Sequence, residues 1–154
     1  MTTTEKKKVI ITLSTVFPGD HPRQGEPTKF VKSLKAGVKI HTIRANDKEL
    51  WEARANDINT GRKYLSVREW IGRPYNSEQR EVARYERVGL QRIQIIYDRN
   101  IQIPPTTIVD GKLISLAMIA KNDGLSLQDL LDYFFPDGDG YFRGVIIHFT
   151  DFRY

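Results

Sequence analysis

The sequence predicts an α+β fold in which a small mixed β-sheet curls into a barrel and helices pack on its outside. Three observations support this prediction. Segments with the period of a strand occur at both ends and in the middle of the 154-residue chain, and segments with the period of a helix lie between them. The two kinds do not alternate regularly, as a doubly wound parallel sheet would require. The length suits one domain, residues 1–154.

The first half of the chain is predicted to contain three strands and two helices. In order, these are a strand at 9–17, a helix at 27–37, a strand at 39–44, a helix at 46–61 and a strand at 62–70. Pro27 suits the first turn of the first helix, and Gly37 suits the position just past its end. In the second helix, Trp51, Ala55 and Ile58 share one face, which predicts that this face packs into the core.

The second half is predicted to contain three strands and two helices. In order, these are strands at 80–88 and 90–98, an irregular segment that begins at 103 and contains an Asp-Gly turn signal, helices at 112–124 and 126–136, and a strand at 141–152. The segment 80–88 fits a helix as well as a strand; as a strand, it can form a hairpin with the next around Gly89. Ser126 and Asp129 approximate a capping box, and Pro136 ends that helix.

Composition excludes several classes of protein. The chain has no cysteine, and therefore no disulfide, thiol nucleophile or cysteine zinc site. No apolar run reaches 18 residues, so we expect no membrane span. Because polar Thr12, Ser14 and Thr15 interrupt the first apolar run, we expect a strand there rather than a secretion signal. The cytoplasm is the expected location.

Positive charge is concentrated in the first 100 residues. The whole chain carries a net charge of +5, whereas residues 1–100 hold 20 basic and 12 acidic residues and residues 101–154 hold 4 and 7. A basic region attracts ligands that carry phosphate. The alternative is an ordinary solvated surface.

The segment 39–44 combines the period of a strand with an unusual number of polar groups. Every second side chain of a strand lies on the same face, so Thr42 and Arg44 share one face and His41 lies on the other. Lys39 follows Gly37 by only two residues, and in such a connection its side chain can turn to either face. These groups can donate protons, accept them or hold an anion.

The strand at 62–70 also has a polar face. Ser66, Arg68 and Trp70 share this face, and Leu65 and Val67 share the opposite one. The two aliphatic residues predict that their face is the core side, which leaves the polar face free for a ligand.

A cationic recess with an aromatic wall follows if these two strands are neighbours. Arg44, Arg68 and Trp70 would line it, and Arg73 and Tyr75 follow in the next turn. Such a recess suits a stacked base and a phosphate held by a guanidinium. Alternatively, each arginine pairs with a surface carboxylate, which is worth about 0–1 kcal/mol, and Trp70 packs into the core.

Other chemical motifs are absent from the sequence. The three histidines, His21, His41 and His148, lack the spacing of a metal site. His148 lies in an apolar segment and is expected to be a hydrogen-bonded structural residue. There is no glycine-rich phosphate loop and no serine elbow, so we expect no metal and no cofactor.

The order of motifs resembles the ASCH family, a PUA-like group of small β-barrel domains. The segments that carry the resemblance are "FVKSLKAGVKIHTIR", "GRKYLSV", "KNDGLSLQDLLDYF" and "GVIIHFTDF", which together cover most of residues 28–152. The N-terminal strand, the tryptophan helix and the segment 65–79 exceed the compact family pattern. In this respect the chain is similar to an elaborated subgroup of bacterial or phage type.

The resemblance implies a function related to RNA or nucleotides. One compact branch of the family removes the acetyl group from acetylated cytidine, with a lysine and a threonine of a "KxxT" motif and a carboxylate before the last helix. By position these correspond to Lys39, Thr42 and Asp123. The acid is a departure, because that branch uses glutamate and aspartate is one methylene shorter. A misplacement of about 1 Å can lower a rate about 100-fold.

Three functions are therefore expected from the sequence. The first and broadest is a module that binds RNA, a nucleoside or a nucleotide in a basic pocket. The second is a small amidohydrolase in which Thr42 attacks the amide, Lys39 is the base and Asp123 protonates the leaving amine. Lys39 serves as the base only if its pKa falls from about 10.4 to near 7, which burial and a neighbouring Arg44 favour. The third is a protein-interaction module that uses 46–61 and 68–79.

Overall fold

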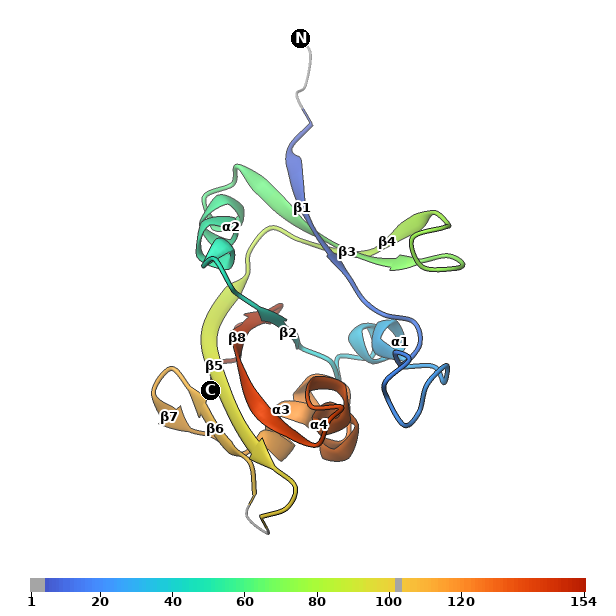
Figure 1. Ribbon diagram of the computed structural model, residues 1–154. Helices are drawn as coiled ribbons and strands as arrows, with labels where there is room; N and C mark the ends of the chain where they lie inside the picture. The colour runs from blue at the N-terminus through green and yellow to red at the C-terminus, as the bar shows by residue number, and fades with distance from the viewer. Residues whose placement is uncertain (1–4, 102–103) are drawn as a thin grey trace.

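Two β-sheets and four helices form the computed structural model, which describes residues 5–101 and 104–154 (Figure 1). The strands are β1 (Lys7–Thr12), β2 (His41–Ala45), β3 (Lys63–Trp70), β4 (Gln79–Tyr85), β5 (Gly89–Asp98), β6 (Thr106–Val109), β7 (Lys112–Leu113) and β8 (Asp139–His148). The helices are α1 (Phe30–Lys35), α2 (Leu50–Asn59), α3 (Leu116–Asn122) and α4 (Leu127–Phe134). The predicted α+β class is confirmed.

The smaller sheet has the order β1-β3-β4, with β1 parallel to β3 and β3 antiparallel to β4. Its register pairs Val9 with Leu65, and these buried side chains lie on the inner face. Ile10 pairs with Ser66 on the opposite face, where Ile10 is 45% exposed. The predicted core side of the strand at 62–70 is therefore correct, and its polar face lies on the outer side of this sheet.

The larger sheet is antiparallel and has the order β2-β8-β5-β6-β7. Asp110 and Gly111 both have positive φ, 47° and 78°, as a two-residue hairpin turn of type I′ requires, so the predicted Asp-Gly turn joins β6 to β7. Residue 103, where the irregular segment was predicted to begin, lies outside the described residues.

The predicted hairpin around Gly89 is wrong. Most of the segment at 80–88 belongs to strand β4, which ends at Tyr85, but β4 pairs with β3, whereas β5 pairs with β8 and β6. Gly89 has a different physical role: the guanidinium of Arg153 occupies the space that a Cβ at this position would need. The glycine thus permits a close side-chain approach rather than a turn.

The helices cover two hydrophobic cores. The first core lies between the inner face of the smaller sheet, α1, α2 and the end of β8, and it contains Trp51, Ala55 and Ile58, as predicted. The second lies between the larger sheet and helices α3 and α4 (Figure 1). The Ser126 hydroxyl accepts a hydrogen bond of 3.1 Å from the Asp129 backbone N–H, which confirms the predicted start of α4.

The predicted closed barrel is not confirmed. Among the described residues, no ladder of hydrogen bonds joins the three-stranded sheet to the five-stranded sheet. The first strand also ends earlier than predicted, at Thr12. The Leu13 backbone N–H still donates to the Arg68 carbonyl, and further along the Phe17 N–H donates to the Glu26 carbonyl across the following loop. None of the helices in the described part of the chain has the length and apolar character needed to cross a membrane.

Candidate functional site

A pocket lies where the two hydrophobic cores meet. The end of β1, α1, β2, the α3–α4 connection and α4 all contribute to its wall. Phe30, Tyr133 and Phe134 supply aromatic surface. The polar lining consists of Ser14, Lys39, Thr42, Arg44 and Asp123. The pocket therefore contains all three residues that the sequence predicts to be catalytic.

Lys39 lies in the connection that precedes β2. Its backbone N–H donates to the Ser33 carbonyl, and its side chain is only 2% exposed. The Nζ atom donates to the Asp123 carboxylate Oδ1 at 2.9 Å and to the Asp123 carbonyl at 3.0 Å, and it lies 4.5 Å from the centre of the Phe30 ring. Because Lys39 is outside the regular strand, its side chain turns to the same pocket as Thr42.

Opposing effects act on the ionisation of this pair. Burial lowers the pKa of Lys39, while the charge and hydrogen bond of Asp123 raise it; burial prevails, and the pKa lies below its ordinary value. Burial alone would raise the pKa of Asp123, but the charge of Lys39 and the hydrogen bond from His41 outweigh it, so this pKa is lowered. Asp123 is therefore a carboxylate at neutral pH.

Thr42 and Arg44 project from the β2 face that borders the pocket. Thr42 is 4% exposed and lines the pocket. The Arg44 guanidinium donates from Nη2 to the Thr12 carbonyl at 2.9 Å. Burial lowers the pKa of Arg44 and the carboxylate of Asp123 opposes this effect; a guanidinium stays charged in either case. The pocket thus combines a hydroxyl, an amine, a guanidinium and a carboxylate.

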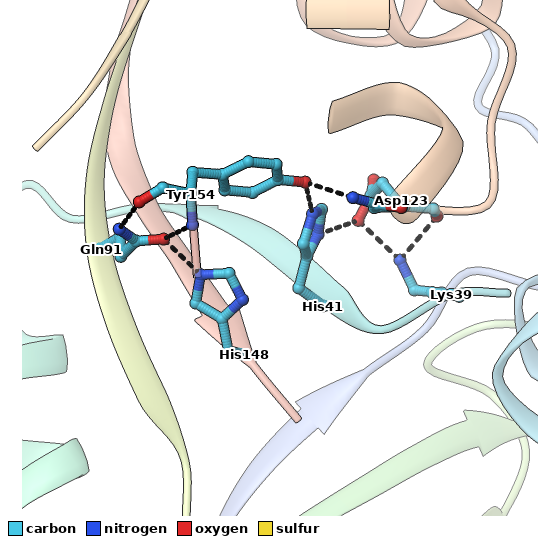
Figure 2. Close-up of polar contacts among 7 residues, drawn as sticks. Lys39, His41, Gln91, Asp123, His148 and Tyr154 are labelled. Atoms are coloured by element: carbon cyan, nitrogen blue, oxygen red, sulfur yellow. Dashed lines mark hydrogen bonds and ion pairs between the residues drawn. The ribbon is translucent and has the colours of Figure 1, made fainter. Parts of the chain in front are cut away.

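His41 lies on the face of β2 opposite to Thr42, as strand alternation predicts, and it does not line the pocket. Its Nδ1 lies 3.3 Å from Asp123 Oδ1, and its Nε2 lies 2.7 Å from the hydroxyl of Tyr154 (Figure 2). The Tyr154 hydroxyl also accepts a hydrogen bond of 3.0 Å from Asn122 Nδ2. His41 is fully buried and contacts the Asp123 carboxylate, so it does not line the pocket as the expected ligand-binding residue would.

A second buried histidine continues this cluster. His148 Nε2 donates to Gln91 Oε1 at 2.8 Å, which agrees with the structural role expected from its apolar segment. Burial, with the positive charge of neighbouring groups, lowers the pKa of His148 to about 3. Its other ring nitrogen, Nδ1, is buried with no partner in the described part of the protein.

The free space in the pocket is small. It amounts to about 30 Å³, which is room for about two water molecules at ~10–15 Å³ each. A whole nucleobase does not fit at this depth. Only a carbonyl-sized end of a ligand can reach Thr42 and Lys39 with these side-chain positions, and the remainder of the ligand has to lie at the mouth.

The predicted recess of Arg44, Arg68 and Trp70 is not formed. Ser66 and Arg68 lie on the outer face of the smaller sheet, where Arg68 Nε donates to Ser66 Oγ at 3.0 Å and Ser66 Oγ donates to Glu81 at 2.6 Å. The physical reason is the alternation of β3: because Leu65 and Val67 face the core, the polar side chains point away from the pocket.

The remaining predicted residues lie at the β3–β4 hairpin. The ring of Trp70 is 5.3 Å from that of Tyr75, which is 86% exposed, and Arg73 is exposed in the same turn. None of these three residues lines the pocket. The structure instead adds Phe30, Tyr133, Phe134, Asn122 and Tyr154 to the site and its support. No motif in the sequence marks Tyr154.

No group of three or more His, Asp or Glu side chains within residues 5–101 and 104–154 is arranged to hold a metal ion. Comparisons of the chain with models of protein families, with curated proteins and with solved structures gave no match.

Proposed function

We propose that the pocket hydrolyses the amide bond of a small N-acylated nucleoside of the acetylated-cytidine type. The observation that carries the proposal is the convergence of Lys39, Thr42 and Asp123 on one pocket, with Lys39 Nζ 2.9 Å from Asp123 Oδ1. A hydroxyl that lines the same pocket as a buried amine with a lowered pKa supplies the two groups that an activated nucleophile needs.

The reaction begins with Thr42 Oγ1 attacking the acyl carbonyl carbon. The neutral form of Lys39 takes the hydroxyl proton, and the oxygen of the resulting tetrahedral intermediate carries negative charge. Arg44 supplies positive charge beside it, as electrostatic stabilisation requires. The carbon–nitrogen bond then breaks, and the ammonium of Lys39 returns the proton to the leaving amine. Water hydrolyses the acyl-threonine, with Lys39 again as base, which releases the acid and restores the hydroxyl.

In the proposed reaction Asp123 does not have the role expected from the sequence, which was to protonate the leaving amine. Its lowered pKa makes it a carboxylate at neutral pH, so it has no proton to give to the leaving amine. In the proposed reaction it holds Lys39 in place instead. With 2.9 Å between Oδ1 and Nζ, the shorter aspartate side chain still reaches the lysine.

Two observations support a nucleoside as the substrate. The motifs that resemble the ASCH family fall on α1, β2, β3, α3, α4 and β8, and β2 pairs directly with β8. The aromatic side chains Phe30, Tyr133 and Phe134 border the pocket, and aromatic surfaces bind planar bases by stacking. The corresponding proposal for the fold is an elaborated PUA-like domain, in which the two sheets take the place of a closed barrel.

A second function, binding of an RNA or nucleotide without turnover, is favoured by one observation. Asp123 contacts the ammonium of Lys39 directly, and this contact stabilises the charged form of the lysine. A lysine that stays charged cannot take a proton from Thr42. It would still act, with Arg44, as a donor to a carbonyl or a phosphate oxygen.

Turnover and binding are separated by one pair of measurements. The purified protein is incubated with N-acetylcytidine, and the release of cytidine is followed by liquid chromatography while binding is followed by calorimetry. Hydrolysis predicts that the wild type releases cytidine and that Thr42→Ala binds but does not release it. Thr106→Ala, an exposed threonine of β6, serves as the control. Binding by both proteins with no release by either supports the second function and contradicts the first.

A further inference from the structure

Four side chains form a hydrogen-bonded chain that ends on the Asp123 carboxylate. Asn122 Nδ2 lies 3.0 Å from the Tyr154 hydroxyl, this hydroxyl lies 2.7 Å from His41 Nε2, and His41 Nδ1 lies 3.3 Å from Asp123 Oδ1 (Figure 2). His41 is fully buried. Asn122, Tyr154 and His41 are not among the residues that line the pocket, so this hydrogen-bonded chain does not contact a ligand there directly.

The chemistry of the groups fixes the direction of each hydrogen bond. An amide nitrogen only donates, and an ionised carboxylate only accepts, so Asn122 donates to Tyr154 and His41 Nδ1 donates to Asp123. Burial raises the pKa of Tyr154 to about 12, so its hydroxyl keeps its proton. The acceptor available to that proton among the described residues is His41 Nε2. All three donors are therefore directed towards Asp123.

Gln91 holds Tyr154 in the position that the hydrogen-bonded chain requires. Its Oε1 accepts from the Tyr154 backbone N–H at 3.0 Å, and its Nε2 donates to the Tyr154 carbonyl at 3.2 Å. The same Oε1 accepts from His148 Nε2, which assigns the proton of His148 to Nε2. The rings of His41 and His148 lie 5.5 Å apart and nearly perpendicular. Two adjacent buried histidines thus carry their protons on different ring nitrogens.

We propose that His41 and Tyr154 are positioning residues that hold the Asp123 carboxylate against Lys39 and so align the base for Thr42. This inference rests on the proposed function. Asp123 Oδ1 is shared by Lys39 Nζ and His41 Nδ1, so the histidine fixes the rotation of the carboxylate at which the lysine is held. Without it, the carboxylate is free to turn and the lysine loses its fixed position.

The first experiment reads the hydrogen-bonded chain itself, by long-range ¹H–¹⁵N NMR of the histidine rings in the ¹⁵N-labelled protein. The expected tautomers are Nδ1–H for His41 and Nε2–H for His148. Tyr154→Phe, which removes one oxygen, should shift the ring nitrogens of His41. It should leave unchanged those of His21, which contacts Asp129 and Phe17 instead. His41 as the Nε2–H tautomer, or a His41 signal indifferent to Tyr154→Phe, overturns the proposal.

The second experiment tests the positioning role by measuring the kinetics of N-acetylcytidine hydrolysis. Tyr154→Phe should lower kcat about 10-fold, which is a part of the ~100-fold loss that a 1 Å misplacement can cause. It should change KM less than about twofold, because neither Tyr154 nor His41 lines the pocket. Tyr141→Phe, an exposed tyrosine of β8, is the control. An unchanged kcat in Tyr154→Phe, or an equal loss in both variants, contradicts a positioning role.

Conservative variants of His41 separate its two contacts. The amide of His41→Asn lies near the place of Nδ1 and can still donate to Asp123, whereas the amide of His41→Gln lies near the place of Nε2 and reaches Tyr154 instead. The proposal predicts that His41→Asn retains more of kcat than His41→Gln; the reverse order contradicts it. If the wild type has the expected tautomers but no turnover, the proposed hydrolysis fails and the hydrogen-bonded chain stands.

Discussion

Lys39 and Asp123 form a buried ion pair between segments 84 residues apart in the chain, with 2.9 Å between Nζ and Oδ1. The lysine lies in the connection between α1 and β2, and the aspartate caps the end of α3. The side chains are 2% and 8% exposed. Because each charge depends on the other in this environment, the pair links the stability of the fold to the chemistry of the pocket.

Removing one partner of this pair should strongly destabilise the protein. Lys39→Met leaves the Asp123 carboxylate buried without its cation, which typically costs about 3–5 kcal/mol. Chemical denaturation measures this as a loss in the free energy of unfolding. Lys35→Met, in which an exposed lysine of α1 is replaced, should change it by about 0.5 kcal/mol or less. Similar values for the two variants would show that the ion pair does not form.

Lengthening the acid should impair the site. The aspartate already reaches Lys39, so the extra methylene of Asp123→Glu has to be accommodated in a packed region, at a cost of about 1–3 kcal/mol. We expect a lower free energy of unfolding and slower release of cytidine. A faster reaction in Asp123→Glu would show instead that the shorter aspartate limits the rate of cytidine release.

Acid should destabilise the fold through His148. Its folded-state pKa is about 3, against an ordinary value of 6.5, so between these values the unfolded chain binds a proton that the folded protein does not. Stability is therefore complete above about pH 6.5 and falls as the pH falls towards 3, by up to about 5 kcal/mol. Denaturation curves at pH 7, 5 and 4 measure this loss.

The matched variant for this measurement is His148→Gln, whose amide can still donate to Gln91 but does not titrate. It should remove most of the slope between pH 6.5 and 4. An unchanged slope in this variant would assign the acid sensitivity to other groups, such as the carboxylate of Asp123.

Binding of RNA, the second proposed function, should depend on salt. Lys32 and Lys35 are exposed on α1, and Lys29 is exposed at its N-cap, next to Phe30 of the pocket wall. Affinity for a single-stranded RNA, measured by fluorescence anisotropy, should fall between 50 and 200 mM salt. Replacing these lysines by glutamine should reduce the slope of log K against log salt by about 0.7 for each phosphate that a lysine no longer neutralises. Lys112→Gln, on the distant β7, is the control, and affinity independent of salt excludes this mode of binding.

Local patterns in the sequence predicted the elements that depend on local interactions. Ser126 caps α4 as expected, and the stripe of Trp51, Ala55 and Ile58 packs into the core. Strand partners depend on contacts between distant segments, and for this reason the predicted turn at Gly89 is wrong. The sequence pattern could not distinguish one closed sheet from two sheets, because this difference also depends on which distant strands pair.

The site was predicted in part. Strand alternation correctly placed Thr42 and Arg44 on one face, and the motif resemblance added Asp123 and a role for Lys39 as base. Alternation also separated Ser66, Arg68 and Trp70 from Leu65, but it does not tell on which side of a sheet another strand will lie. Tyr154 follows no motif, and only the folded chain brings its hydroxyl to His41.

Trapping the acyl-enzyme is the sharpest test of an attack by Thr42 on an acyl group. The protein is mixed with N-acetylcytidine, quenched in acid within the first turnovers, digested, and analysed by peptide mass spectrometry. We expect an acetyl group on Thr42 in the wild type and none in Thr42→Ala. No acetyl group on Thr42, together with full recovery of N-acetylcytidine after hours of incubation, would refute the proposed hydrolysis.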